Sequence, residues 1–133
     1  MKLLDLEPKF LRWERRRETV TVANDPANFP IGGSREEERD QLYYIVVDTL
    51  AEAWGVEFLC PKCFEENKGP VGTHMVICWS PVVPLDISPG PGRWELKGTG
   101  LHDLSLVAGS SSVKLEGGCN AHFMVENGET RNC

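Results

Sequence analysis

The chain of 133 residues lacks long apolar runs, an excess of positive charge and a secretory leader. No apolar run, Tyr43–Val47 included, approaches the roughly 20 residues of a membrane-spanning helix. Lys and Arg number 14 against 20 Asp and Glu, and the net charge of −6 argues against nucleic-acid binding, because neutralising phosphates requires a basic surface. Asp5 and Glu7 interrupt the apolar stretch that a secretory signal needs. We therefore expect a cytoplasmic protein that binds neither membrane nor nucleic acid.

Sequence patterns of catalysis are also scarce. Neither Gly90–Gly92 nor Gly98–Gly100 is followed by the Lys-Ser/Thr of a phosphate-binding loop. Ser110–Ser112 lies outside the context of a nucleophile elbow. His102 and Asp103 are adjacent, and adjacent strand residues point to opposite faces of a sheet. We therefore predict no catalytic residues.

Composition and turn residues predict a mainly β fold. Hydrophobic residues make up 41% and charged residues 26% of the chain, which is typical of globular proteins. Stretches rich in β-branched and aromatic residues lie between turns formed by nine prolines and thirteen glycines. The expected strands are Gln41–Val47, Val56–Leu59, His74–Trp79, Arg93–Lys97, Leu104–Val107, Ser112–Glu116, Ala121–Glu126 and Thr130–Cys133. A short helix is expected at Thr49–Trp54, and a hairpin at Asn127-Gly128, because both residues tolerate positive φ.

The first third of the chain differs from the rest. Residues 1–23 predict a β-hairpin or two short strands. Residues 24–40 keep no apolar period and predict a long mobile loop, with a solvated charged tract at its end or a capped helical turn as the alternative. We therefore divide the chain into N-terminal strands with a mobile acidic loop, residues 1–45, and a β domain, residues 46–133, within one continuous globular domain.

The spacing of the cysteines predicts a metal site. Five cysteines cannot all pair within one chain, and disulfides are rare in a reducing compartment. Cys60 and Cys63 form a CxxC after a predicted strand, and Cys119 and His122 repeat that spacing as CxxH. Two such pairs supply the Cys₃His ligands of a closed structural zinc site. Because 55 residues separate the two motifs, we expect a zinc-ribbon-like antiparallel β domain with strands inserted between the metal-binding turns.

Two further cysteines are weaker candidates. The predicted Asn127-Gly128 hairpin brings Cys133 back towards the second motif, so Cys133 is a reserve ligand that could replace Cys119 or His122. Cys78 lies inside a predicted strand and is expected to be a small, buried, apolar residue.

Two alternative chemistries are less favoured. A redox CxxC normally opens a helix within a βαβ unit, and the residues after Cys63 predict no such helix. His74 opens a predicted strand and is expected to be a surface histidine, with a role as general base as the alternative.

Four segments carry a resemblance to known proteins: LAEAWGVEFLCPKCFEENKGPVGTHMVICW, GRWELKGTGLHDLSL, SSVKLEGGCNAHF and VENGE. Over residues 46–133 the chain resembles a group of small phage and bacterial zinc-knuckle proteins of unknown function, which share a strand ending in CPxC and a Cys/His turn that enters a hairpin. The resemblance implies a phage or prophage origin but no reaction. The ligands that it implies are Cys60, Cys63 and His122, with Cys119 or Cys133 as the fourth.

A closed four-ligand site favours protein binding over hydrolysis, because it leaves no position for water. We therefore expect a protein-interaction module that targets another protein, such as a host factor, with the acidic run Glu36–Glu38 steering a basic partner. One alternative is a zinc-dependent hydrolase with an open metal site, in which His74 or Glu65 is the base. The other is a virion or assembly component.

Overall fold

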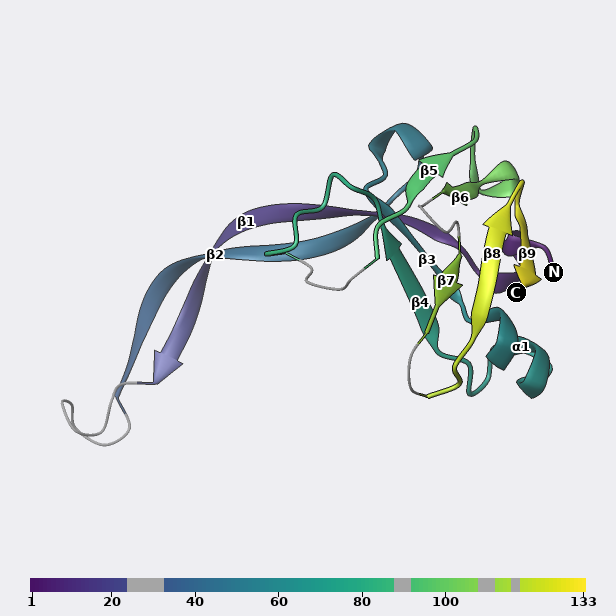
Figure 1. The fold of residues 1–133 in the computed structure, drawn as a ribbon. Helices are drawn as coiled ribbons and strands as arrows, with labels where there is room; N and C mark the ends of the chain where they lie inside the picture. Colours follow the sequence, from purple (N-terminus) through teal and green to yellow (C-terminus); the bar gives the residue numbers. More distant parts are fainter. Residues whose placement is uncertain (24–32, 88–91, 108–111, 116–117) are drawn as a thin grey trace. The chain divides into compact units, whose positions relative to one another are not determined.

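The computed structural model describes residues 1–23, 33–87, 92–107, 112–115 and 118–133, and confirms a mainly β fold (Figure 1). The strands are β1 (Lys9–Ala23), β2 (Ser34–Val47), β3 (Gly55–Leu59), β4 (Met75–Trp79), β5 (Glu95–Lys97), β6 (Ser105–Val107), β7 (Val113–Lys114), β8 (His122–Glu126) and β9 (Glu129–Asn132). The helical elements are α1 (Pro61–Asn67) and the 3-10 turns η1 (Leu3–Leu6), η2 (Leu50–Glu52) and η3 (Leu101–Asp103). The chain forms two compact units: the core unit, Met1–Arg12 with Val46–Cys133, and the hairpin unit, Trp13–Ile45.

In the core unit, β3 is the strand with which β1 and β4 align. The start of β1 pairs antiparallel with β3, with Phe10 opposite Val56, and β4 pairs antiparallel with β3, with Cys78 opposite Val56. Because side chains alternate between the faces of a sheet, these three residues share one face with Phe58 and Val76, and all of them are buried. Burying an aliphatic or aromatic side chain contributes about 1.5–3 kcal/mol, so this face is a main part of the hydrophobic core.

The strands β7, β8 and β9 form a second antiparallel sheet, and β5 and β6 form a third. On β8, Phe123 and Val125 are buried, while Met124 between them is half-buried. This alternation is that of a strand with one covered face. The rings of Phe58 in β3 and Phe123 in β8 meet edge to face, with centroids 5.9 Å apart and planes at 77°, an arrangement that ring quadrupoles favour. This contact joins the first sheet to the second.

The predicted Asn127-Gly128 hairpin is confirmed, and it joins β8 to β9. Both residues have positive φ, 49° for Asn127 and 75° for Gly128, as a type I′ turn requires. Gly128 donates its N–H to the carbonyl oxygen of Leu104, and its own carbonyl accepts the N–H of Leu3, both at 2.8 Å. A Cβ on Gly128 would clash with the carbonyl oxygen of His102. Only glycine therefore fits this position.

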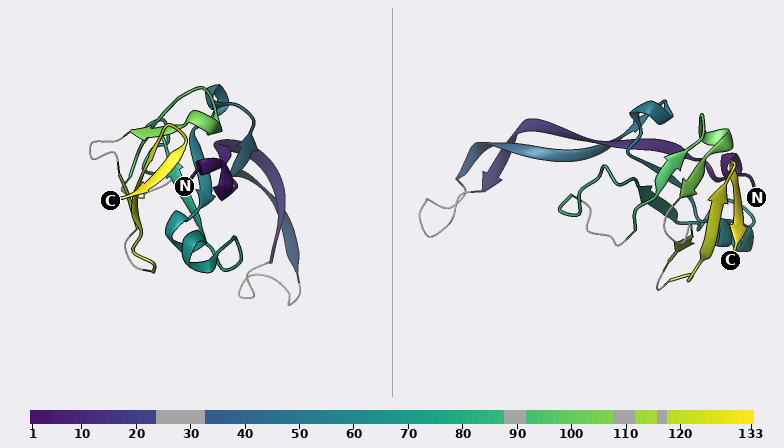
Figure 2. Two further views of the ribbon diagram at one scale, coloured as in Figure 1. Left: turned by 90° about the vertical axis from the view of Figure 1, so that its right-hand side faces the viewer. Right: turned by 45° about the horizontal axis from the view of Figure 1, so that its top comes forward.

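The first residues of the chain pack beside β9. The Met1 amino group donates to the carbonyl oxygen of Thr130 at 3.2 Å, and the Thr130 N–H donates to the carbonyl oxygen of Met1 at 2.8 Å. Both views in Figure 2 place the N-terminal segment next to the β8–β9 hairpin. Leu3 and Leu6 of η1 are buried, so η1 is part of the core. Residues 1–23 therefore hold η1 and one long strand, and not the predicted hairpin or pair of short strands.

The hairpin unit corrects the prediction for the charged tract. Residues 24–40 were expected to be a mobile loop, but residues 34–40 belong to strand β2; residues 24–32 lie outside the described residues. Charged residues occupy both faces of this part of β2, so the apolar alternation that identifies a strand is missing. The ion pair between Arg17 of β1 and Glu38 of β2, at 3.0 Å, is one of the contacts that link the two strands instead.

The short helices also differ from the prediction. The helix expected at Thr49–Trp54 is the 3-10 turn η2, and the α-helix is α1, which begins at Pro61 and spans 7 residues. A helix of this length is too short to show an apolar stripe in the sequence. In the part of the chain that the structure describes, no helix is long and apolar enough to cross a membrane.

We predict that Gly128→Ala lowers the free energy of unfolding by about 2 kcal/mol or more, because alanine is strained at positive φ and its Cβ would displace the backbone of His102. Chemical denaturation monitored by tryptophan fluorescence measures the loss. The matched control is Asn127→Ala, which needs no space for a new Cβ and should lose about 1 kcal/mol or less. A Gly128→Ala chain as stable as the unmodified chain would contradict this account of the turn.

Candidate metal centre

The CxxC motif lies where β3 ends and α1 begins. Cys60 directly follows β3 and is buried, and Pro61 occupies the first position of α1, where a proline is favoured because this N–H has no helical partner. The carbonyl oxygen of Cys60 accepts the N–H of Phe64 at 2.9 Å. Positions three apart in a helical turn lie on one side, so Cys63 is placed next to Cys60.

The helix α1 corrects one expectation about this motif. The residues after Cys63 predict no helix, yet α1 opens at the motif. The strands before and after α1, β3 and β4, are antiparallel partners, whereas a thioredoxin-like redox CxxC lies in a βαβ unit with parallel strands. The context of the motif is therefore not that of a thioredoxin-like redox site.

Strand β4 brings His74 to the same place. The antiparallel register sets Met75 opposite Leu59, and the pairing continues with a hydrogen bond from the Cys60 N–H to the carbonyl oxygen of His74 at 2.9 Å. His74 is therefore the cross-strand neighbour of Cys60. Its side chain is exposed, whereas Cys60 is buried, so His74 forms the solvent-facing rim of the site.

Cys119 comes from the turn between β7 and β8, 59 residues along the chain from Cys60. The backbone of this turn has positive φ at Gly118, 54°, and at Asn120, 51°, a conformation that glycine and asparagine adopt most readily. The Lys62 ammonium donates to the carbonyl oxygen of Cys119 at 2.6 Å. This charge-assisted hydrogen bond holds the turn against the start of α1.

Four donor atoms converge at this point. The Sγ atoms of Cys60, Cys63 and Cys119 and a ring nitrogen of His74 all lie within 4.8 Å of one another. The Sγ atoms of Cys60 and Cys119 are 3.8 Å apart, and His74 Nε2 is 3.3 Å from Cys119 Sγ. A tetrahedral ion with bonds of about 2.3 Å to sulfur and about 2.0 Å to nitrogen would set these two edges at about 3.8 and 3.5 Å. The donor atoms therefore have the spacing of a tetrahedral metal site.

The thiols of the group differ in acidity. Burial raises the pKa of Cys60. Desolvation, followed by hydrogen bonds with Cys119 and Cys60, raises the pKa of Cys63 to about 12. A hydrogen bond from His74 is the largest of the causes that lower the pKa of Cys119 to about 7. Three adjacent thiolates would repel one another, so a bound cation is needed to keep all three deprotonated together.

Backbone N–H groups already point at two of the sulfurs. The N–H groups of Lys62 and Cys63 form hydrogen bonds with the Cys60 sulfur, and the N–H of Ala121 forms one with the Cys119 sulfur. Hydrogen bonds of this kind orient metal ligands and stabilise the thiolate form. The local backbone of both motifs is therefore arranged for thiolates rather than for buried neutral thiols.

The histidine of the group is His74 and not His122, which the CxxH spacing and the resemblance favour. His122 begins β8 and is exposed. Ala121 and Phe123 on either side of it are buried, and alternation in a strand points His122 away from the face that they share. The spacing of CxxH fits a turn, but the start of β8 changes the direction of its last residue.

His74 is the functional residue that the sequence analysis treats as a surface histidine. Its Nδ1 lies 3.3 Å from the carbonyl oxygen of Met75, while its Nε2 faces Cys119. A proton on Nδ1 leaves the lone pair of Nε2 for a metal. The signal that could have identified His74 is the pairing of the two strands, since antiparallel β3 and β4 bring the end of one opposite the start of the other.

Cys133 and Cys78 lie outside the four-residue group. The N–H of Cys133 donates to the carbonyl oxygen of His122 at 3.0 Å, and its side chain is exposed. Cys78 is buried in β4, as expected, and this burial raises its pKa to about 12. The structure thus brings together three of the four predicted ligands, the three cysteines, and adds a histidine from another strand.

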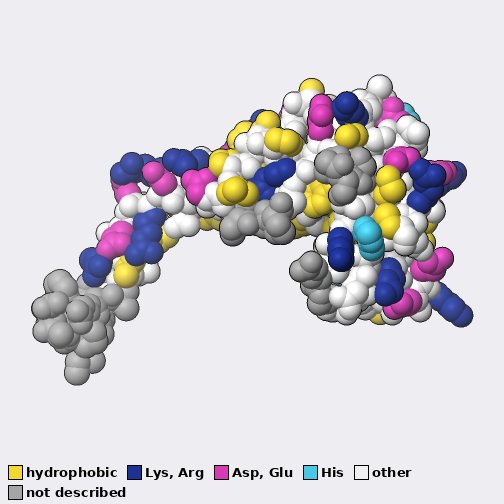
Figure 3. Space-filling model, in the orientation of Figure 1, with side chains coloured by type: hydrophobic (Ala, Val, Ile, Leu, Met, Phe, Trp, Pro, Cys, Tyr) yellow, Lys and Arg dark blue, Asp and Glu magenta, His cyan; other side chains and the backbone are white. Residues whose placement is uncertain are grey.

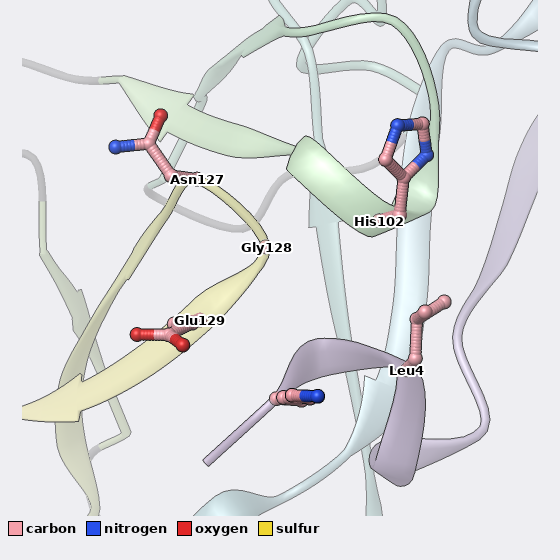
Figure 4. Close-up of a pocket in the computed structure, with 6 residues that line it drawn as sticks. Leu4, His102, Asn127, Gly128 and Glu129 are labelled. Atoms are coloured by element: carbon pink, nitrogen blue, oxygen red, sulfur yellow. The ribbon is translucent and has the colours of Figure 1, made fainter.

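A separate concavity of about 230 Å³ contains none of these residues (Figure 4). Its lining residues are Lys2, Leu4, His102, Asn127, Gly128 and Glu129. In Figure 4 the side chains of Asn127 and Glu129 point away from His102. No set of groups converges there that would act on a bound molecule.

His102 and Asp103 do not form a catalytic pair. The Asp103 carboxylate accepts the N–H groups of Thr99 and Gly100, each at 2.9 Å, and the Thr99 hydroxyl at 2.8 Å. These bonds, with that of the Thr99 hydroxyl the largest, lower the pKa of Asp103 to about 2. The carboxylate therefore stabilises its own turn, and His102 Nε2 is 4.0 Å from it.

Comparisons with protein-family models, with curated proteins and with solved structures find no match for the chain. The assignment of the metal centre therefore depends on the positions of its own donor atoms. The resemblance to small phage and bacterial proteins stays a prediction.

We predict that His74→Ala weakens metal binding by more than about 100-fold, because it removes a ligand rather than an outer partner. His122→Ala, the matched control, should bind the metal as the unmodified chain does. Cobalt(II) titration followed by visible absorption measures both affinities and reports tetrahedral thiolate coordination. If His122→Ala lost the metal while His74→Ala kept it, the ligand set described here would be refuted.

The cysteines allow a second comparison of the same kind. Cys119→Ser should reduce the metal content of the purified chain, whereas Cys133→Ser should leave it unchanged, because only the first sulfur lies among the donors. Elemental analysis of both variants gives the ratio of metal to protein. Equal losses in the two variants would show that Cys133 replaces Cys119 at the metal.

Proposed function

We propose that the protein binds one zinc ion through Cys60, Cys63, Cys119 and His74, and that this zinc is structural. The observation that supports the proposal is the mutual approach of four donor atoms to within 4.8 Å. Three soft thiolates with one imidazole favour zinc over magnesium or calcium, which prefer oxygen ligands. Five free cysteines and a thiolate site also fit a reducing compartment such as the cytoplasm.

The proposed zinc acts by connecting weak segments. It would join the start of α1, the start of β4 and the β7–β8 turn, which are far apart in the sequence. Structural zinc contributes on the order of 10 kcal/mol in small domains at neutral pH, comparable to the whole stability of a domain. The metal therefore has the energy needed to hold the zinc-ribbon-like part of the core unit together.

Protein binding is the activity that we propose for the metal-bound chain. Four protein ligands complete a tetrahedron, so the site keeps no position for the water that a hydrolytic zinc activates. The described residues also hold several exposed large apolar side chains, including Leu42, Tyr44 and Met75, which single out surfaces for contact with another protein. We therefore favour an interaction module over an enzyme.

The experiment that tests the metal proposal is elemental analysis together with X-ray absorption at the zinc edge. We expect one zinc per chain, with three sulfur neighbours and one nitrogen neighbour. A purified, folded chain without zinc would contradict the proposal. A zinc with fewer protein ligands and a bound oxygen would instead support a zinc-dependent hydrolase.

We predict that exhaustive chelation loosens the metal-binding segments before the rest of the core unit. The amides of Phe64, in α1, and Leu115, before the β7–β8 turn, form the hydrogen bonds nearest the site and should lose hydrogen-exchange protection. Amides of the β3–β4 pair, which the apolar core stabilises, should lose less. Unchanged protection at Phe64 and Leu115 after complete zinc removal would contradict a structural role of the metal.

A further inference from the structure

The hairpin unit is a two-stranded ribbon that covers none of its own side chains. Among residues 13–22 and 33–45 no side chain is buried. An isolated two-stranded ribbon is marginally stable in water, and strands as long as β1 and β2, with 15 and 14 residues, are well above the usual length of about five or six. The ribbon therefore keeps both faces and an edge accessible to another molecule.

One face of the ribbon is electrostatically complete, and we call it the paired face. On it the Glu37 carboxylate forms ion pairs with Arg35 at 2.7 Å and with Arg39 at 2.8 Å. The Tyr43 hydroxyl donates to Glu18. The guanidinium of Arg16 lies over the Tyr43 ring, 5.7 Å from its centroid. These contacts leave little uncompensated charge on the paired face.

The opposite face differs, and we call it the open face. Alternation along β2 places there three carboxylates followed by two large apolar side chains. These residues are Glu36, Glu38, Asp40, Leu42 and Tyr44. Leu42 is 40% and Tyr44 49% exposed. Figure 3 shows acidic and basic side chains interleaved along the hairpin unit, with apolar atoms among them.

The carboxylates of the open face outnumber its cations. Arg17 of β1 pairs with Glu38 at 3.0 Å, and in the described part of the chain neither Glu36 nor Asp40 has an ion pair. Trp13 of β1 lies against Tyr44, with ring centroids 5.4 Å apart and planes at 81°. The open face of β2 therefore has an acidic half and an aromatic and aliphatic half.

The edge of β2 adds a second, independent feature. In the sheet order β2-β1-β3-β4, β2 is a terminal strand, so within the described residues no strand lies on its other side. The N–H and C=O groups of such an edge are a template for one more strand. A protein strand repeats its side chains on one face at the same interval as β2 does, so its residues would align one to one with the open face.

We propose that the free edge of β2 binds an extended segment of another protein, whose alternate residues are basic opposite Glu36, Glu38 and Asp40 and apolar opposite Leu42 and Tyr44. The backbone of the segment supplies the hydrogen bonds, and its alternate side chains supply the specificity. This inference rests on the proposed role as an interaction module and names its surface and the chemistry of its partner. It does not depend on the identity of the metal.

The test uses the full, zinc-loaded chain and two synthetic strands. One strand carries Ile, Val, Lys, Lys and Lys at alternate positions with Thr between them, and the other carries Glu in place of Lys. By fluorescence anisotropy we expect the Lys strand to bind at least about tenfold more tightly, with NMR shift changes centred on residues 34–44. Equal affinities, or shifts centred elsewhere, would overturn the proposal.

Two sets of variants with the same change in net charge separate the two faces. The open-face set combines Glu36→Gln, Glu38→Gln and Asp40→Asn. The paired-face control combines Glu14→Gln, Glu18→Gln and Glu37→Gln. We expect the open-face set to weaken binding of the Lys strand about tenfold and the control to change it less than about twofold. Equal effects of the two sets would reduce the binding to net charge and overturn the assignment.

A third arm tests strand addition itself. Methylation of the backbone nitrogens of the Lys strand that face β2 removes donors without changing side chains, and we expect it to abolish detectable binding. Undiminished binding would overturn strand addition, and so would a dimer in light scattering that binds neither strand, because the edge would then belong to a second copy. Zinc measured in the same samples keeps the questions apart: a zinc-loaded chain that binds no strand overturns this inference alone, and a zinc-free chain that binds the Lys strand overturns the metal centre alone.

Discussion

The convergence of three sulfurs and one imidazole nitrogen is the constraint on which the core unit depends. α1 has 7 residues and β7 only 2, and elements this short are not stable alone. The turn that carries Cys119 buries no side chain between Gly118 and Asn120, so burial of apolar area does not explain its position. The hydrogen bond from Lys62 and the proposed metal bonds do. Short segments with little hydrophobic contact are thereby fixed at one point.

Strand β3 determines which residues meet at that point. Its buried face, with Val56 and Phe58, packs in the core, and this packing fixes its register with β4. A shift of the register by one residue would move His74 away from Cys60 and turn the apolar side chains of β4 towards water. The same hydrophobic alternation that stabilises the sheet therefore also assembles the metal ligands, although none of those ligands is part of the apolar core except Cys60.

The two units of the chain gain their order from different interactions. The core unit combines buried apolar faces, the Asn127-Gly128 turn and the metal centre. The hairpin unit has no buried side chain among its described residues, and ion pairs and ring contacts on its surface link its strands. Exposed ion pairs contribute little, about 0–1 kcal/mol each. A segment with so little internal stability is suited to gain order from a partner, which is the role that we infer for it.

The sequence by itself determined the features that depend on neighbouring residues. Alternating apolar residues predicted the mainly β fold, Asn127-Gly128 predicted the hairpin, and the motif spacing predicted that the three grouped cysteines bind one metal. Only the tertiary structure decided that His74 takes the place of His122 and that the charged tract Ser34–Asp40 is a strand. The physical reason is that strand register and side-chain direction are set by pairing between segments distant in the chain, and a local pattern contains neither the partner nor the face.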